Sequence, residues 1–268
     1  MEIASLIAAM LLTGAAGGVL AGLLGVGGGI VIVPVLEIAL GLVGVDPSVR
    51  MHIAVATSLA TIIPTSISSA RAHYRRDSVD FGVIRYWSPW IVVGAIAGIL
   101  IAANVGAEFL AAVFAVVAFA VAIKMALPLD DKHLTGDVPR GIFGPVVPVT
   151  IGSISTLMGI GGGTLSVMAM TLASKPIHLA VGTAALFGLV IALPATLGYI
   201  ITGWGNELLP AGSLGYVNLL GFVVISPATV LFAPLGAKIA HALPRRQLSS
   251  LFGLFLFIVA IRMAYRAF

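Results

Sequence analysis

The glycine-rich motif Gly25-Val-Gly-Gly-Gly29 indicates how this chain is organised, because it reappears as Gly159-Ile-Gly-Gly-Gly163. Two further pairs of motifs recur in the same order: His52-Ile-Ala-Val-Ala-Thr57 with His178-Leu-Ala-Val-Gly-Thr183, and Ala122-Ile-Lys-Met125 with Ala260-Ile-Arg-Met263. Motifs that recur in the same order indicate an internal duplication. The sequence therefore predicts two related repeats, residues 1–126 and 141–268, with a cytoplasmic linker, residues 127–140, between them.

The composition places both repeats in a membrane. Of the 268 residues, 60% are hydrophobic and 9% are charged, and the mean hydropathy is +1.15. So little polar surface cannot coat a water-soluble globule, and a lipid bilayer must therefore solvate most of the chain. The formal net charge is +4, but the basic residues lie in short connecting loops, which argues against nucleic acid as a partner.

Each repeat contains five apolar segments, which predicts an all-α polytopic membrane protein. The segments are residues 3–24, 28–43, 51–70, 86–104 and 108–126, then 141–158, 162–173, 178–203, 217–242 and 247–265. The second segment of each repeat begins at the triple glycine and is too short to span, because a spanning helix needs roughly 20 residues. We expect these two segments to be half-helices or re-entrant pieces that follow a glycine-rich break.

The distribution of lysine and arginine predicts that the two repeats have inverted topology. The loop 71–85 contains four arginines, whereas the equivalent loop 203–216 contains Glu207 and no basic residue. Basic residues in short loops favour the cytoplasmic side. Equivalent loops then face opposite sides of the membrane, as in transporters built from inverted repeats.

The successive glycines indicate a place where an anion can approach the backbone. Glycine permits the left-handed conformations in which neighbouring N–H groups converge, and a helix that starts there adds its dipole. Close packing of helices is the alternative explanation for such glycines. The candidate substrate-binding residues from the breaks are Gly27, Gly28 and Gly29, with Gly161, Gly162 and Gly163 in the second repeat.

Polar residues that follow the breaks extend the candidate site. His52 and His178 are each followed five residues later by a threonine, Thr57 or Thr183. Imidazole can exchange a proton near neutral pH, and a hydroxyl can donate to an anion. Glu37 is the acid most clearly inside an apolar stretch. We therefore consider both histidines and Glu37 as proton-coupling candidates, although structural roles at the membrane interface remain the alternative.

The glycine breaks, the His52-x-x-x-x-Thr57 spacing and His73-Tyr74 before Val79-Asp80 together resemble the sulfite exporter TauE/SafE family of permeases. The resemblance covers essentially the whole chain. It implies a multi-pass protein of a prokaryotic inner membrane that transports sulfite, sulfonates or related organosulfur or carboxylate anions. It also implies a site made of the two glycine triplets with Thr57 and Thr183. The polar candidates for a deep pocket are Ser58, Thr61, Ser153 and Ser155.

These features predict a secondary transporter of a small anion rather than an enzyme. No residues form a recognisable catalytic group, metal cluster or ATP-binding loop, and we expect no cofactor. An anion channel with the same lining and a non-transporting membrane assembly factor are the alternatives. The identity of the anion, the direction of transport, the coupling ion and homo-oligomerisation are left open by the sequence.

Overall fold

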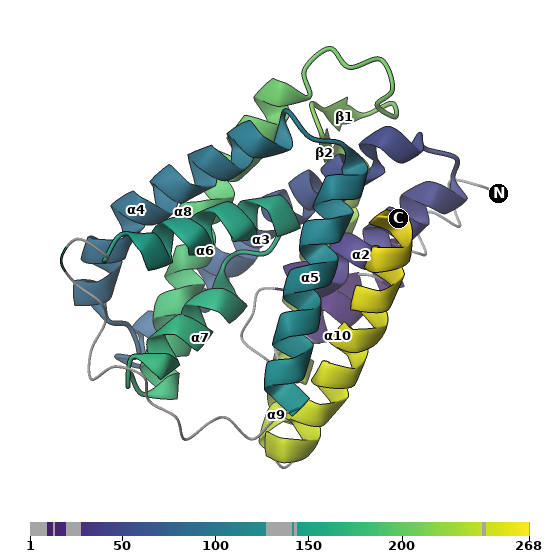
Figure 1. Ribbon diagram of the computed structural model, residues 1–268. Coiled ribbons are helices and arrows are strands. Elements are labelled where there is room, and N and C mark those ends of the chain that lie inside the picture. Colours follow the sequence, from purple (N-terminus) through teal and green to yellow (C-terminus); the bar gives the residue numbers. More distant parts are fainter. Residues whose placement is uncertain are drawn as a thin grey trace.

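The computed structural model describes residues 10–12, 14–19, 28–126, 141, 144–242 and 245–267 (Figure 1). Within them the regular elements are helices apart from one small β-hairpin, so the predicted all-α class is confirmed. The linker 127–140 and Gly27 lie outside the described residues.

The first repeat contributes four labelled helices: α2 (Gly29–Leu42), α3 (Pro47–Tyr74), α4 (Phe81–Ala102) and α5 (Ala107–Ala126). The predicted starts of α3 at residue 51 and of α4 at residue 86 were wrong. Each helix begins earlier, after a capping aspartate. Segments defined by apolar residues alone do not include such a polar residue. The Asp46 carboxylate accepts from the Ser48 N–H at 2.8 Å, and the Asp80 carboxylate accepts from the Val83 N–H at 3.0 Å.

The second repeat contributes α6 (Val146–Met158), α7 (Gly163–Leu172), α8 (Ile177–Thr202), α9 (Leu219–Ala242) and α10 (Arg245–Ala267). Between α8 and α9, β1 (Ser213–Leu214) pairs antiparallel with β2 (Val217–Asn218). The sequence analysis did not predict this hairpin. Its turn depends on Gly215, which has a φ of 53° and lies so close to the Ile200 carbonyl that a Cβ would collide with it.

The lengths of the helices separate spanning elements from shorter ones. Among the described residues, four helices are long and apolar enough to cross a membrane: Pro47–Tyr74, Phe81–Ala102, Ala107–Lys124 and Ile177–Thr202. By contrast, α2 has 14 residues and α7 has 10. At a rise of 1.5 Å per residue they extend about 21 and 15 Å, less than the roughly 30 Å hydrocarbon core. The prediction that both are too short to span is confirmed.

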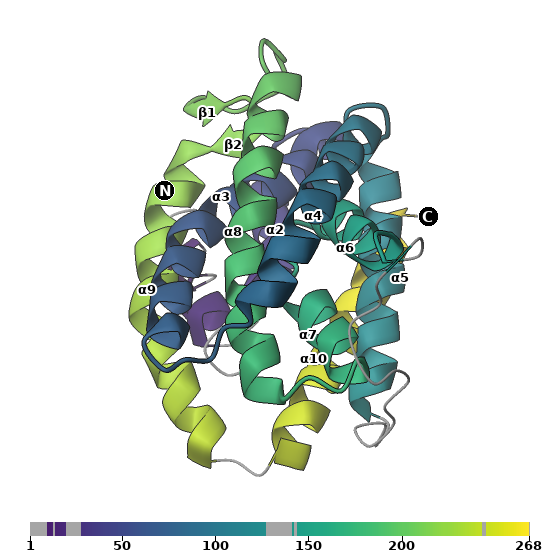
Figure 2. The same ribbon diagram turned by 90° about the vertical axis from the view of Figure 1, so that its left-hand side faces the viewer.

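The two repeats pack into one body. In the middle α3 packs against α8, while α4 lies beside α6 and α5 lies beside α10 (Figures 1 and 2). Each of these contacts joins a helix of the first repeat to a helix of the second. Glycines allow α4 and α6 to approach closely: a Cβ at Gly98 would stand 2.8 Å from the Ser153 carbonyl oxygen, and one at Gly152 would collide with the Ile91 carbonyl.

The loops that follow α3 and α8 lie at opposite ends of α3. The first of them, residues 75–80, continues from the end of α3. The second, residues 203–218, reaches the start of α3, where the Tyr216 ring stacks on the His52 ring at 4.9 Å between centroids. This arrangement is the one expected of inverted repeats. The orientation of either loop relative to a membrane stays a prediction.

Cysteine labelling tests the inversion, because the natural chain contains no cysteine. We expect Ser78→Cys and Ala211→Cys to react with a membrane-impermeant maleimide from opposite faces of sealed vesicles. Permeabilised vesicles, in which both positions should react, provide the control. Labelling of both cysteines from the same face would contradict inverted topology.

Candidate functional site

Both glycine breaks end in the same backbone conformation. Gly28 caps α2 with φ 74° and ψ −13°, and Gly162 caps α7 with φ 69° and ψ −2°. Side chains with a Cβ are disfavoured in this left-handed region, so glycine determines where each short helix begins. Neither cap supplies a side-chain acceptor. The amides that open the two helices therefore need acceptors from elsewhere.

The two breaks meet in the buried interior. A Cβ on Gly29 would collide with the Gly159 carbonyl oxygen and would lie 3.1 Å from the Ile160 Cα. The Ser58 hydroxyl donates to the same Gly159 oxygen at 2.7 Å. The structure thus brings Gly29 and Ser58 of the first repeat against Gly159 and Ile160, which immediately precede the glycine triplet of the second. At Gly29, close backbone packing alone already requires glycine.

The repeated threonines bind helix starts in the opposite repeat. The buried Thr57 hydroxyl oxygen accepts from the Asn218 N–H at 2.9 Å, immediately before α9. The Thr183 hydroxyl oxygen accepts from the Asp80 N–H at 2.9 Å, immediately before α4. Because α4 and α9 are repeat equivalents, these two contacts are equivalent and reciprocal. A role of either threonine in anion binding stays a prediction, since an accepting hydroxyl still has a proton to donate.

The two candidate histidines have different surroundings. His52 is buried, and its Nε2 lies 3.1 Å from the Ala102 carbonyl oxygen, which makes Nε2 the protonated nitrogen. Its Nδ1 is buried without a partner among the described residues. His178, at the start of α8, is exposed. Equivalent positions in the sequence therefore do not give equivalent sites, and proton coupling by either residue stays a prediction.

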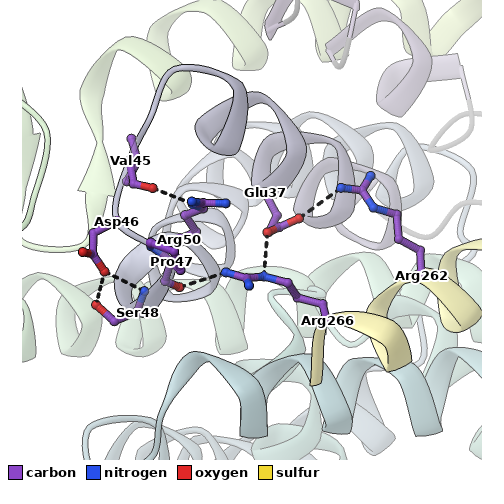
Figure 3. A network of polar contacts seen from close by, with 8 residues as sticks. All are labelled: Glu37, Val45, Asp46, Pro47, Ser48, Arg50, Arg262 and Arg266. Atoms are coloured by element: carbon purple, nitrogen blue, oxygen red, sulfur yellow. Dashed lines mark hydrogen bonds and ion pairs between the residues drawn. The ribbon is translucent and has the colours of Figure 1, made fainter. Parts of the chain in front are cut away.

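Glu37 belongs to an ion-pair network that the sequence analysis did not predict (Figure 3). Its side chain is 4% exposed, and it pairs with Arg262 at 3.4 Å and Arg266 at 3.2 Å, both on α10. Arg266 also donates to the Pro47 carbonyl at 3.2 Å. A buried charge normally requires such partners. The network ties α2 to α10, and a proton-coupling role of Glu37 stays a prediction.

A second ion pair ties the end of α7 to α4. The Lys175 ammonium lies 3.0 Å from the Asp80 carboxylate. Burial alone raises the pKa of the Asp80 carboxyl, but the hydrogen bond from the Val83 N–H and the Lys175 ammonium lower this pKa below its usual value. Both ion-pair groups join the two repeats, one at each end of α3.

The candidate hydroxyl groups differ in whether they donate a hydrogen bond within the protein. Three of the four donate to backbone carbonyl groups: Ser58 to Gly159 at 2.7 Å, Thr61 to Ser58 at 2.7 Å, and Ser153 to Gly94 at 2.8 Å. Ser155 is fully buried, and its hydroxyl has no partner among the described residues. Ser166 in α7 is likewise fully buried, and its hydroxyl has no partner among the described residues.

The sequence analysis missed Ser166. Its position three residues after Gly163, on the first turn of the short helix, could have identified it.

Known proteins are similar to this chain over nearly its whole length. The family model described as "Sulfite exporter TauE/SafE" matches residues 10–263. A "Probable membrane transporter protein" of Haemophilus influenzae is 35% identical over 94% of this chain and 96% of its own length. Similarly named proteins of Methanocaldococcus jannaschii and Bacillus subtilis are 27% and 24% identical, over 94% and 96% of each chain. No solved structure matches this chain. These names indicate a membrane transporter rather than an enzyme.

Replacing Thr57 or Thr183 with alanine should lower the thermal unfolding midpoint of the detergent-solubilised protein. Either change leaves a helix-starting N–H without its acceptor, and an unsatisfied buried donor costs roughly 1–3 kcal/mol. Serine at either position keeps a hydroxyl and should cost less. Thr202→Ala is the matched control, because the exposed Thr202 hydroxyl donates only to Gly198 of its own helix. Alanine variants as stable as the Thr202 control would contradict this role.

Proposed function

The chain belongs to the sulfite exporter TauE/SafE family, and we propose that this multi-pass membrane transporter is a secondary carrier of a small anion in a prokaryotic inner membrane. The proposed substrate is sulfite, a sulfonate or a related organosulfur or carboxylate anion. The observation that carries the proposal is the pair of buried, glycine-capped helix starts at Gly28 and Gly162. Free amides and the dipole at a helix start attract negative charge.

The surroundings of the breaks favour an anion over a cation. Glu37 and Asp80, the two acids that the structure ties to the short helices α2 and α7, are already paired with arginine or lysine. A cation would need oxygen ligands that are free to bind it. Around the breaks the described residues offer N–H and hydroxyl donors instead. Donors without a nearby free carboxylate suit a negatively charged substrate.

A carrier mechanism accounts for the contact between the repeats. Each break belongs to one repeat, and the breaks meet where Gly29 faces Gly159. In the proposed inverted arrangement, movement of one repeat against the other exposes this place to each side of the membrane in turn. The proposed lining consists of the two glycine triplets with Thr57, Ser58 and Thr183.

Two other functions predict different behaviour. An anion channel with the same lining would conduct continuously, because it would not need to change conformation for each ion. A membrane assembly factor would transport nothing and would have no need for two buried, equivalently capped breaks. The paired breaks therefore favour transport over assembly, and conductance distinguishes a channel from the proposed carrier.

Counterflow in proteoliposomes tests the carrier. Vesicles that contain the purified full chain are preloaded with unlabelled sulfite, methanesulfonate, sulfate or acetate, and uptake of the labelled anion is measured. We expect a transient overshoot with sulfite or methanesulfonate that protein-free vesicles lack. Conductance far above carrier turnover would indicate a channel instead. The absence of both, with every anion tested, would refute anion transport.

Proton coupling is tested with the histidine pair. If protons accompany the anion, a pH gradient imposed on the same vesicles should drive accumulation, because imidazole gains and loses a proton near neutral pH. The double variant His52→Gln/His178→Gln should keep exchange but lose this response, and the single variants separate the buried histidine from the exposed one. Retention of the full response would leave Glu37→Gln as the next variant and would contradict a role of the histidines.

A further inference from the structure

We propose that, within this lining, the direct hydrogen bonds to the anion come from the hydroxyls of Ser155 and Ser166 and the amides that open α7, while the α2 break forms the facing wall by packing. The proposal rests on the anion transport proposed above and assigns the binding site to particular residues. It is built from α6, the break 159–162 and the first turn of α7.

Ser155 supplies a hydroxyl directed at the break. Its side chain is fully buried, and the described residues contain no partner for its hydroxyl. The Ser155 Oγ lies 3.4 Å from the position that a Cβ would occupy on Gly162. A buried hydroxyl without a hydrogen bond is unfavourable. A serine in this state beside a helix start is explained if a bound anion accepts the hydrogen bond from its hydroxyl.

Ser166 supplies the second hydroxyl from the other side of the break. It lies on the buried face of α7 together with Gly163 and Met170. A helical side chain leans toward the preceding turn, which here is Gly162 and Gly163. A serine in a helix can donate to the carbonyl four residues earlier, but the Ser166 hydroxyl has no such partner in the described structure.

The opening amides of α7 complete the set of donors. Ser166 is the first residue of α7 whose N–H reaches a carbonyl one turn earlier, the Gly162 oxygen at 2.8 Å. The N–H groups of Gly163, Thr164 and Leu165 therefore precede the regular hydrogen-bond ladder. Together with the two hydroxyls they form a set of neutral donors suited to the oxygens of an oxyanion.

The first repeat lacks the corresponding groups. Alignment of the two glycine motifs places Ala21 opposite Ser155 and Ile32 opposite Ser166. Ile32 is fully buried, so the first turn of α2 presents a methyl-bearing side chain where α7 presents a hydroxyl. In addition, the Gly159 carbonyl covers Gly29. Gly29 is thus covered by backbone, whereas the nearest atoms at Gly161 and Gly162 are the ends of the Ile62 and Ile191 side chains. A side chain can move aside for a ligand more easily than backbone, so the duplicated motif provides one anion site rather than two.

Thermal unfolding of purified variants with and without sodium sulfite or methanesulfonate tests this assignment. Ser155→Ala and Ser166→Ala should unfold at or above the wild-type temperature without anion, because each removes an unsatisfied buried group. Their affinity for the anion should fall about tenfold or more, since each loses a hydrogen bond to a charged ligand. The stabilisation by anion should shrink accordingly.

Ser153→Ala is the matched control on the same helix. It removes the hydrogen bond to Gly94 and should show the opposite pattern, with a lower unfolding temperature but normal stabilisation by the anion. Ile32→Ser should leave affinity unchanged. If the wild type transports the anion while Ser155→Ala and Ser166→Ala bind it normally, this inference is wrong and the proposed function stands. If the wild type neither binds nor transports any oxyanion tested, the proposed function fails as well.

Discussion

A backbone amide inside a bilayer has no water to accept its hydrogen bond, and this constraint governs where the helices of this protein can begin. The starts of α4 and α9 satisfy it in the same way: a threonine hydroxyl from the other repeat accepts the N–H of the capping residue, Thr183 for Asp80 and Thr57 for Asn218. The capping side chains then accept from the first turn of their own helices. Neither helix start is complete within its own repeat. The two repeats must therefore pack against each other before the capping amides of either are satisfied.

The duplication preserved backbone geometry more strictly than side-chain chemistry. Gly28 and Gly162 have nearly identical dihedral angles, because the turn that starts each short helix tolerates little else. Away from this turn the repeats diverge. Glu37, which pairs with arginines on α10, aligns with Thr171, whose hydroxyl bonds within its own helix; the end of α7 is held instead by Lys175. In the proposed binding site, a shared fold with different polar groups lets one break bind the anion while its equivalent packs.

The sequence could predict the all-α class and the two short helices, because the lengths of the apolar segments can be compared directly with the thickness of a bilayer. It could not predict the limits of α3 and α4, since the capping aspartates are polar residues outside the apolar segments. Nor could it distinguish Ser155 from Ser58. Both are serines close to the breaks, but only packing shows that the Ser58 proton is already donated to Gly159 and that the Ser155 proton is not. His52 and His178 illustrate the same limit, because matching motifs led to one buried and one exposed ring.

The polar links between the repeats are distributed in a way that suits a carrier. In the interior they are neutral hydrogen bonds, those of Thr57 and Ser58, each of which contributes about 0.5–1.5 kcal/mol net. A few such bonds amount to a few kcal/mol, comparable to the gap between alternative conformations of a switching protein. The ion pairs lie toward the two ends, Glu37 with the α10 arginines near the start of α3 and Asp80 with Lys175 beyond its end. In the proposed carrier, movement of the repeats can therefore separate charged partners at one end, where water can solvate them, while the pair at the other end stays closed. The interior rearranges only neutral groups, so no unpaired charge needs to be exposed to the membrane core.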